Sequence, residues 1–374
     1  MSWKLPSAKP GSSSRFSPSR IRSWRGRHDV SSIGRDYARA PMDGPALCYW
    51  SGRERRMNRR AWLAFAAMSA IWGVPYLFIK IAVDGGAPPA GVAWARVTLA
   101  AVVLLVLAAR AGALRALRGR LRWVAAYGLV EIAVPFPLIA FGEQRIPSSM
   151  AAIMIASVPL LLAVVSLRYG RVERPTPARM AGLLIGFAGV IALVGINLSS
   201  RPGELPGVLA LLGAAAGYTF GPLILERHLV ELDPRATMGV GLAVASLALA
   251  PLAALTAPSH LPSGGALASI AVLGLLCTAL AFVIFTVLIG EAGPARASVI
   301  TYLNPVVAVC LGVLVLGEQP GAATVAGLLL ILAGSWLSTG GRLPPGLLAR
   351  LRAKRAGAPS EGAARSAGAV EAAA

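Results

Sequence analysis

The sequence predicts an all-α integral membrane protein with ten transmembrane helices, arranged as two inverted five-helix repeats. Three observations predict this class: the composition, ten apolar runs long enough to cross a bilayer, and a spaced motif that occurs twice. Of the 374 residues, 56% are hydrophobic and 14% are charged, and the mean hydropathy is +0.67. A soluble domain is roughly 45–50% apolar and about 25% charged. Because a chain this apolar cannot hide its surface in water, the composition excludes a soluble enzyme and a disordered protein.

The net charge of +20 does not indicate nucleic-acid binding, because of where the charges lie. Residues 1–56 contain twelve Lys and Arg against four acidic residues, and residues 341–374 contain six against two. Most other charges fall in short gaps between apolar runs, as in polytopic membrane proteins. Three scattered cysteines and three histidines match no disulfide framework or metal spacing. We therefore expect no metal and no cofactor.

Both ends of the chain are predicted to be disordered. Residues 1–56 form a basic extension rich in Ser, Arg, Pro and Gly, without hydrophobic periodicity. This extension is either an organelle transit segment or lies upstream of a true start at Met57. We favour Met57, since Asn58-Arg59-Arg60 leads directly into an apolar run. Residues 341–374 form a basic, then Ala-rich tail.

Ten membrane spans are predicted, since a hydrocarbon core of ~30 Å requires about 20 apolar residues per helix. They cover 61–83, 89–109, 122–142, 147–167, 178–197, 206–226, 236–257, 266–290, 294–316 and 321–340. With the N-terminus inside, the inner loops contain twelve arginines and the outer loops only Arg145 and Arg201. This positive-inside bias places both termini in the cytoplasm. We expect the membrane to be the bacterial inner membrane.

A repeated motif divides the chain into two units, residues 57–198 and residues 199–340. Both copies read E-x-P-x6-G-x6-G, and their members are Glu173, Pro175, Gly182 and Gly189 in the first, and Glu318, Pro320, Gly327 and Gly334 in the second. The copies are 145 residues apart. Because each unit has five spans, an odd number, the second must enter the membrane upside down. Inverted repeats are typical of secondary transporters.

The same stretches resemble a known family. Residues 143–195, which include IPSSMAAIMIASVPLLLAVVSLRYGRVERPTPARMAGLLIGFAGVIALVG, are similar to the first EamA repeat of the drug/metabolite transporter superfamily. Residues 290–337 resemble the end of the second repeat, and AIWGVPYLFIK at 70–80 resembles the start of the first. The resemblance implies a secondary transporter of small metabolites, often an exporter, with a central cavity between the repeats. The sixth span has Gly217 and Leu225 where the first has Trp72 and Lys80, so symmetric roles for these two residues are not expected.

Glu131 is the main candidate for a functional charge. It lies near the middle of the third predicted span, where a carboxylate costs on the order of 3 kcal/mol or more and usually faces a cavity or a partner. Low dielectric favours the neutral form of such a group, so Glu131 is a candidate proton-coupling site. The alternative is a structural carboxylate paired with Arg96, which lies roughly 6 Å away along the bilayer normal at 1.5 Å per residue.

Other residues are candidates to line a substrate pathway. They are Trp72, Tyr76, Tyr127, Tyr218, Tyr302 and Asn304. Helix packing is the alternative interpretation of each aromatic side chain. Pro135, Pro137 and Pro305 free backbone carbonyls and are candidate hinges. At the predicted outer side, we expect Lys80 to snorkel, and Glu143 and Arg145 to pair across a turn or to form a gate.

The function that the repeats and the resemblance predict is secondary active transport of a small metabolite, amino acid or drug-like compound by alternating access. Export follows from the resemblance alone, and proton coupling from Glu131. The alternatives are an importer or exchanger of the same fold, or a membrane scaffold or receptor. An enzyme is not expected, because no nucleophile–base pair or metal ligand set lies at membrane depth. The expected partners are the lipid bilayer and a small-molecule substrate, with protons as a candidate, and the sequence leaves the oligomeric state open.

Overall fold

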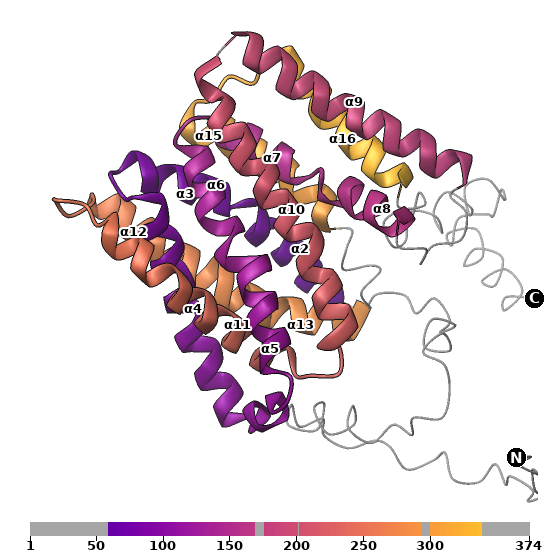
Figure 1. The fold of residues 1–374 in the computed structure, drawn as a ribbon. Coiled ribbons are helices and arrows are strands. Elements are labelled where there is room, and N and C mark those ends of the chain that lie inside the picture. Colours follow the sequence, from indigo (N-terminus) through magenta and orange to yellow (C-terminus); the bar gives the residue numbers. More distant parts are fainter. Residues whose placement is uncertain (1–58, 169–175, 201, 293–299, 339–374) are drawn as a thin grey trace, which may run out of the picture. The chain divides into compact units, whose positions relative to one another are not determined.

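The computed structural model describes residues 59–168, 176–200, 202–292 and 300–338 (Figure 1). Within these ranges every regular element is a helix. The predicted terminal extensions, and Glu173 and Pro175 of the repeated motif, lie outside the described residues.

The first half of the chain contains α2 to α9. Their bounds are α2 Arg59–Gly73, α3 Pro75–Asp84, α4 Pro89–Arg110, η3 Ala113–Leu117, α5 Leu121–Tyr127, η4 Gly128–Ala133, α6 Pro135–Glu143, α7 Ser148–Ile155, α8 Val158–Arg168 and α9 Pro177–Ser200. The second half has η5 Pro202–Glu204, α10 Leu205–His228, α11 Pro234–Leu255, α12 Gly264–Gly274, η6 Leu275–Leu280, α13 Ala281–Ala292, α15 Ile300–Leu316 and α16 Ala322–Ser338.

Eight helical segments in the described residues are long and apolar enough to cross a membrane. They are Arg59–Asp84, Pro89–Arg110, Leu121–Glu143, Ser148–Val165, Pro177–Gly195, Leu205–His228, Pro234–Leu255 and Gly264–Leu288. Each begins and ends within two residues of one of the first eight predicted spans. The ninth and tenth predicted spans contain α15 and α16, which are apolar helices of 17 residues each. The structure thus bears out an integral membrane helical protein, and the count of ten spans stays a prediction.

The third and eighth spans are interrupted by π-helical turns. These turns are η4 and η6, and they begin at residues 128 and 275, which are 147 residues apart. A π-turn inserts a residue into the helix ladder, and such turns occur frequently at functional sites. In the third span, α6 begins at Pro135 directly after the π-turn, and because proline has no N–H, a carbonyl of the preceding turn loses its partner in the helix. Both π-turns lie in the third span of their half of the chain.

Helices α9 and α16 pack tightly against each other through the glycines of the repeated motif (Figure 1). Gly334 lies on Gly186, whose backbone an added Cβ would overlap, and Gly182 lies against Leu337 and Ser338. Gly189 lies against Leu330 and Ile331, and Gly327 lies against Leu193, so the contacts run in opposite directions along the two helices. This is the pairing of two antiparallel helices, and small residues permit their close approach.

Candidate functional site

Arg96 is a buried cation at the junction of three segments. Its side chain on α4 is 9% exposed. Its Nε donates a hydrogen bond of 2.8 Å to Thr278 Oγ1 in the π-turn η6, and the guanidinium carbon lies 4.2 Å from the ring centroid of Phe136 on α6. Tyr76 and Tyr218 are near enough to interact with it electrostatically. Arg96 forms no ion pair with a described residue, although Glu143 is among its electrostatic neighbours.

Glu131 lies in the π-turn η4 and is half-buried. Its Oε2 is buried without a hydrogen-bond partner. The carboxylate packs on Gly221 of α10, where a Cβ would overlap it, and Tyr127 and Tyr218 are its electrostatic neighbours. The pairing with Arg96 that we weighed from sequence does not form. Their similar depth in the membrane does not bring the two side chains together, because Glu131 faces α10 while Arg96 turns toward η6 and α6.

The candidate aromatic residues fall into separate groups. Tyr76 and Tyr218 lie beside Arg96, and Tyr127 donates to Met238 Sδ at 3.3 Å. Trp72 packs elsewhere, against Phe285 and Phe282 of α13 with ring centroids 4.7 and 6.2 Å apart. Tyr302 shares that second group.

The remaining polar candidate and the prolines lie on α6 and α15. Asn304 of α15 has a buried Oδ1 without a hydrogen-bond partner. Pro135 packs on Gly217 of α10, where an added Cβ would come within 2.6 Å of the ring. Pro137 lies in the first turn of α6, and the buried Pro305 lies inside α15, which continues past it. The role of these prolines as hinges stays a prediction.

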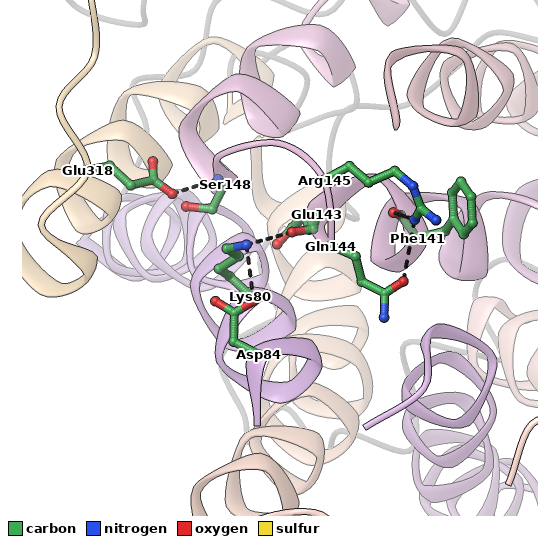
Figure 2. Close-up of polar contacts among 8 residues, drawn as sticks. All are labelled: Lys80, Asp84, Phe141, Glu143, Gln144, Arg145, Ser148 and Glu318. Carbon is green, nitrogen blue, oxygen red and sulfur yellow. Dashed lines mark hydrogen bonds and ion pairs between the residues drawn. The ribbon is translucent and has the colours of Figure 1, made fainter. Parts of the chain in front are cut away.

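The second copy of the repeated motif caps a helix in the first half of the chain. The Glu318 carboxylate accepts a hydrogen bond from the backbone N–H of Ser148 at the start of α7 (2.7 Å; Figure 2). It also accepts one from the backbone N–H of Ser149 (3.0 Å). The first N–H groups of a helix have no partner within it, and an anion there is favoured by the helix dipole. Pro320 follows in the segment that leads to α16. Glu318 therefore ties the two halves together, a contact that sequence reasoning missed.

Next to this cap lies a polar cluster at the same end of α3 and α6 (Figure 2). Lys80 Nζ donates to the backbone carbonyl of Glu143 (2.8 Å) and forms an ion pair with Asp84 (3.1 Å). The predicted Glu143–Arg145 pair does not form, because Arg145 lies 3.7 Å over the ring of Phe141 and donates to its carbonyl at 3.1 Å. Lys80 is half-buried and anchored here rather than extended to water. A shallow pocket of about 390 Å³ opens beside the cluster, lined by Val83, Asp84, Gln144 and Arg145.

Replacement of Glu318 by alanine is expected to destabilise the protein by about 1–2 kcal/mol, the usual cost of a lost helix N-cap. The melting temperature of the purified protein in detergent should fall for Glu318→Ala and fall less for Glu318→Gln, which keeps one acceptor oxygen. Glu226→Ala, at an exposed carboxylate on α10, is the control. Equal melting temperatures for Glu318→Ala and the control would contradict the capping role.

The fold and the buried polar site define a polytopic helical protein of the membrane-transporter class. The chain belongs to the EamA-like transporter family, whose model matches residues 59–195 and again residues 205–340. This bears out the family predicted from the sequence motifs. It also establishes a membrane transporter rather than an enzyme.

Three comparisons with single proteins agree with this assignment. The chain is 33% identical over 264 residues to the "Uncharacterized inner membrane transporter YedA" of Escherichia coli K12, covering 68% of this chain and 82% of that protein. It is 28% identical to a "Probable terminal-alkyne amino-acid exporter" of Streptantibioticus cattleyicolor, covering 74% and 94%. A solved structure titled "Crystal structure of protein" matches with a TM-score of 0.55 at 24% identity, over 75% of this chain and 97% of that one. The chain is thus an integral inner membrane protein with this fold.

Proposed function

We propose that this protein is a secondary active transporter that exports a small metabolite carrying a carboxylate, such as an amino acid, by alternating access. The observation that carries the proposal is Arg96. A buried guanidinium without an acidic partner costs several kcal/mol in desolvation, and its planar donors match a carboxylate. A substrate carboxylate would supply the missing charge. Relatives named as amino-acid exporters support this class of substrate.

The glycine contacts of α9 and α16 support the inverted arrangement. If the two copies are related by a two-fold axis in the membrane, a contact between residue i of α9 and residue j of α16 must recur between residues i + 145 and j − 145. Gly182 meets Ser338 and Gly327 meets Leu193, which is the same contact in the two copies. With α15 and α16 at the lower limit of a spanning length of about 17–25 residues, the count is ten spans and both termini lie in the cytoplasm.

Alternation between the two halves requires hinges and a coupling group. Pro135, Pro137 and Pro305 are the proposed hinges, since each frees a backbone carbonyl inside a span. Glu131 is the proposed proton-coupling carboxyl, because its buried Oε2 has no hydrogen-bond partner. A bound proton would neutralise the carboxylate and so remove the free-energy cost of burying its charge. Tyr76, Tyr127 and Tyr218 would line the path beside it.

Replacing Glu131 by glutamine is expected to reduce export at least about tenfold, because glutamine cannot release a proton. The measurement is untargeted analysis of spent medium from cells that overexpress the full chain, Glu131→Gln, or Glu226→Gln as an exposed control, at equal membrane levels. One metabolite class should accumulate outside with the unmutated protein and with the control only. Medium that is unchanged for every protein would overturn export, and uptake of labelled amino acids would then test an importer.

A further inference from the structure

Glu143, the last residue of α6, is a buried acid that the proposed pathway does not use. Its side chain is 0% exposed, and both carboxylate oxygens are buried without a hydrogen-bond partner. Glu131 has one oxygen of this kind. Among the described residues Glu143 is therefore the carboxyl that most lacks a compensating group.

The neighbouring cation does not neutralise Glu143. Lys80 Nζ is engaged by the backbone carbonyl of Glu143 and by the Asp84 carboxylate, as Figure 2 shows. The other titratable groups that face Glu143 are Tyr76 on α3, Arg96 on α4 and Glu318 before α16. Of these, Arg96 is bonded to Thr278 and Glu318 to the start of α7.

An ionised carboxylate in this position would lack both water and a direct partner, which costs several kcal/mol. A bound proton removes this cost without requiring any further ligand. A sodium ion fits less well, because hard cations prefer about six oxygen ligands. The one other unpartnered oxygen in this cluster is Ser148 Oγ, and the ammonium group of Lys80 would repel the ion.

We propose that Glu143 is a proton-binding site of the transporter, occupied while α6, α7 and the Glu318 segment are closed together as in this structure. The inference rests on the proposed function, since it gives alternating access a second coupling group at the outer end. When that end opens, water reaches the carboxyl, the O–H bond breaks, and the proton leaves to water. The bonding electrons stay on the carboxylate, which then pairs with Lys80.

The direct test is infrared spectroscopy of the full-length protein in lipid vesicles at pH 7 without substrate. The unmutated protein should show the C=O stretching band of a protonated carboxylic acid buried from water. Glu143→Gln should lose a component of this band that the matched variant Glu131→Gln keeps. A band that is absent from the unmutated protein, or is the same in Glu143→Gln, overturns the proposal. A band that shifts when sodium replaces potassium, and does so only while Glu143 is present, identifies sodium as the ligand and also overturns it.

Two further measurements keep the test decisive. Glutamine has the shape of the protonated acid, so Glu143→Gln should melt at the temperature of the unmutated protein. If it does not fold, Glu143→Asp should retain the acid band at a shifted frequency, and an unshifted band contradicts the site. Measuring transport distinguishes this proposal from the proposed function. A Glu143 band without any exported metabolite would support the proton site and contradict the proposed function. Export without the band would support the proposed function and contradict the proton site.

Discussion

Arg96→Ala is expected to lower the export rate at least about 30-fold without removing the protein from the membrane. Truncating one partner of a buried charge pair costs on the order of 2–5 kcal/mol, and about 2 kcal/mol corresponds to this factor. The loss should be large because Arg96 is the buried cation of the site, held between Thr278 and Phe136. The measurement is the rate of metabolite release per unit of membrane-inserted protein.

Two companion variants make the Arg96 result specific. The export rate of Arg96→Lys should lie between those of the unmutated protein and Arg96→Ala, since lysine keeps the charge and loses the planar donor pair. Arg118→Ala, at an exposed residue of the loop after α4, should export normally. Normal export by Arg96→Ala would remove Arg96 from the transport site.

Gly334→Leu is expected to abolish the folded protein. A Cβ at this position would overlap the backbone of Gly186 and come within 2.6 Å of the Gly182 carbonyl oxygen. Overpacking against side chains typically costs about 1–3 kcal/mol, and here the obstacle is backbone, so α9 and α16 must separate. The yield of monodisperse protein in detergent and its melting temperature measure the effect.

Gly195→Leu is the control for Gly334→Leu. It lies on α9, where an added Cβ meets nothing within 4 Å, so its yield should equal that of the unmutated protein. A normal yield and melting temperature for Gly334→Leu would show that α9 and α16 do not pack through the motif glycines.

The spans could be predicted from sequence because the bilayer fixes their length and apolar character. Eight predicted ranges agree with helical segments within two residues. The interruptions were harder to predict. Pro75 and Pro135 mark two helix starts in advance, but the π-turn at Leu275–Leu280 has no proline and no charge to indicate it.

The residues of the candidate site could be selected from the sequence more readily than the contacts between them. Arg96 and Glu131 were identifiable because charges inside apolar runs are rare and usually functional. Their depths placed them close together, but depth along a helix does not fix the direction of a side chain. The π-turn in which Glu131 lies changes that direction, so the carboxylate faces Gly221.

The polar cluster of Lys80, Asp84, Glu143 and Arg145 shows a different limit of sequence reasoning. Glu143 follows an apolar span and precedes a polar turn, a position at which a carboxylate normally reaches water. Its complete burial depends on packing by distant segments, which include α3 and the region of Glu318. The motif has a glutamate at the same position in both copies, which marked Glu318 as a residue with a role. The motif alone does not identify the N–H groups of α7 as the partners of Glu318.

Counterflow in liposomes tests most directly whether this protein is a carrier that alternates between two states. The full-length protein is reconstituted in vesicles loaded with a mixture of unlabelled amino acids, and uptake of the same labelled amino acids is followed, with Arg96→Ala alongside. We predict that the internal load stimulates uptake of at least one labelled amino acid, and that Arg96→Ala abolishes this stimulation. Uptake that is independent of the internal load would indicate a channel, and the absence of any protein-dependent flux would contradict amino-acid transport by this chain.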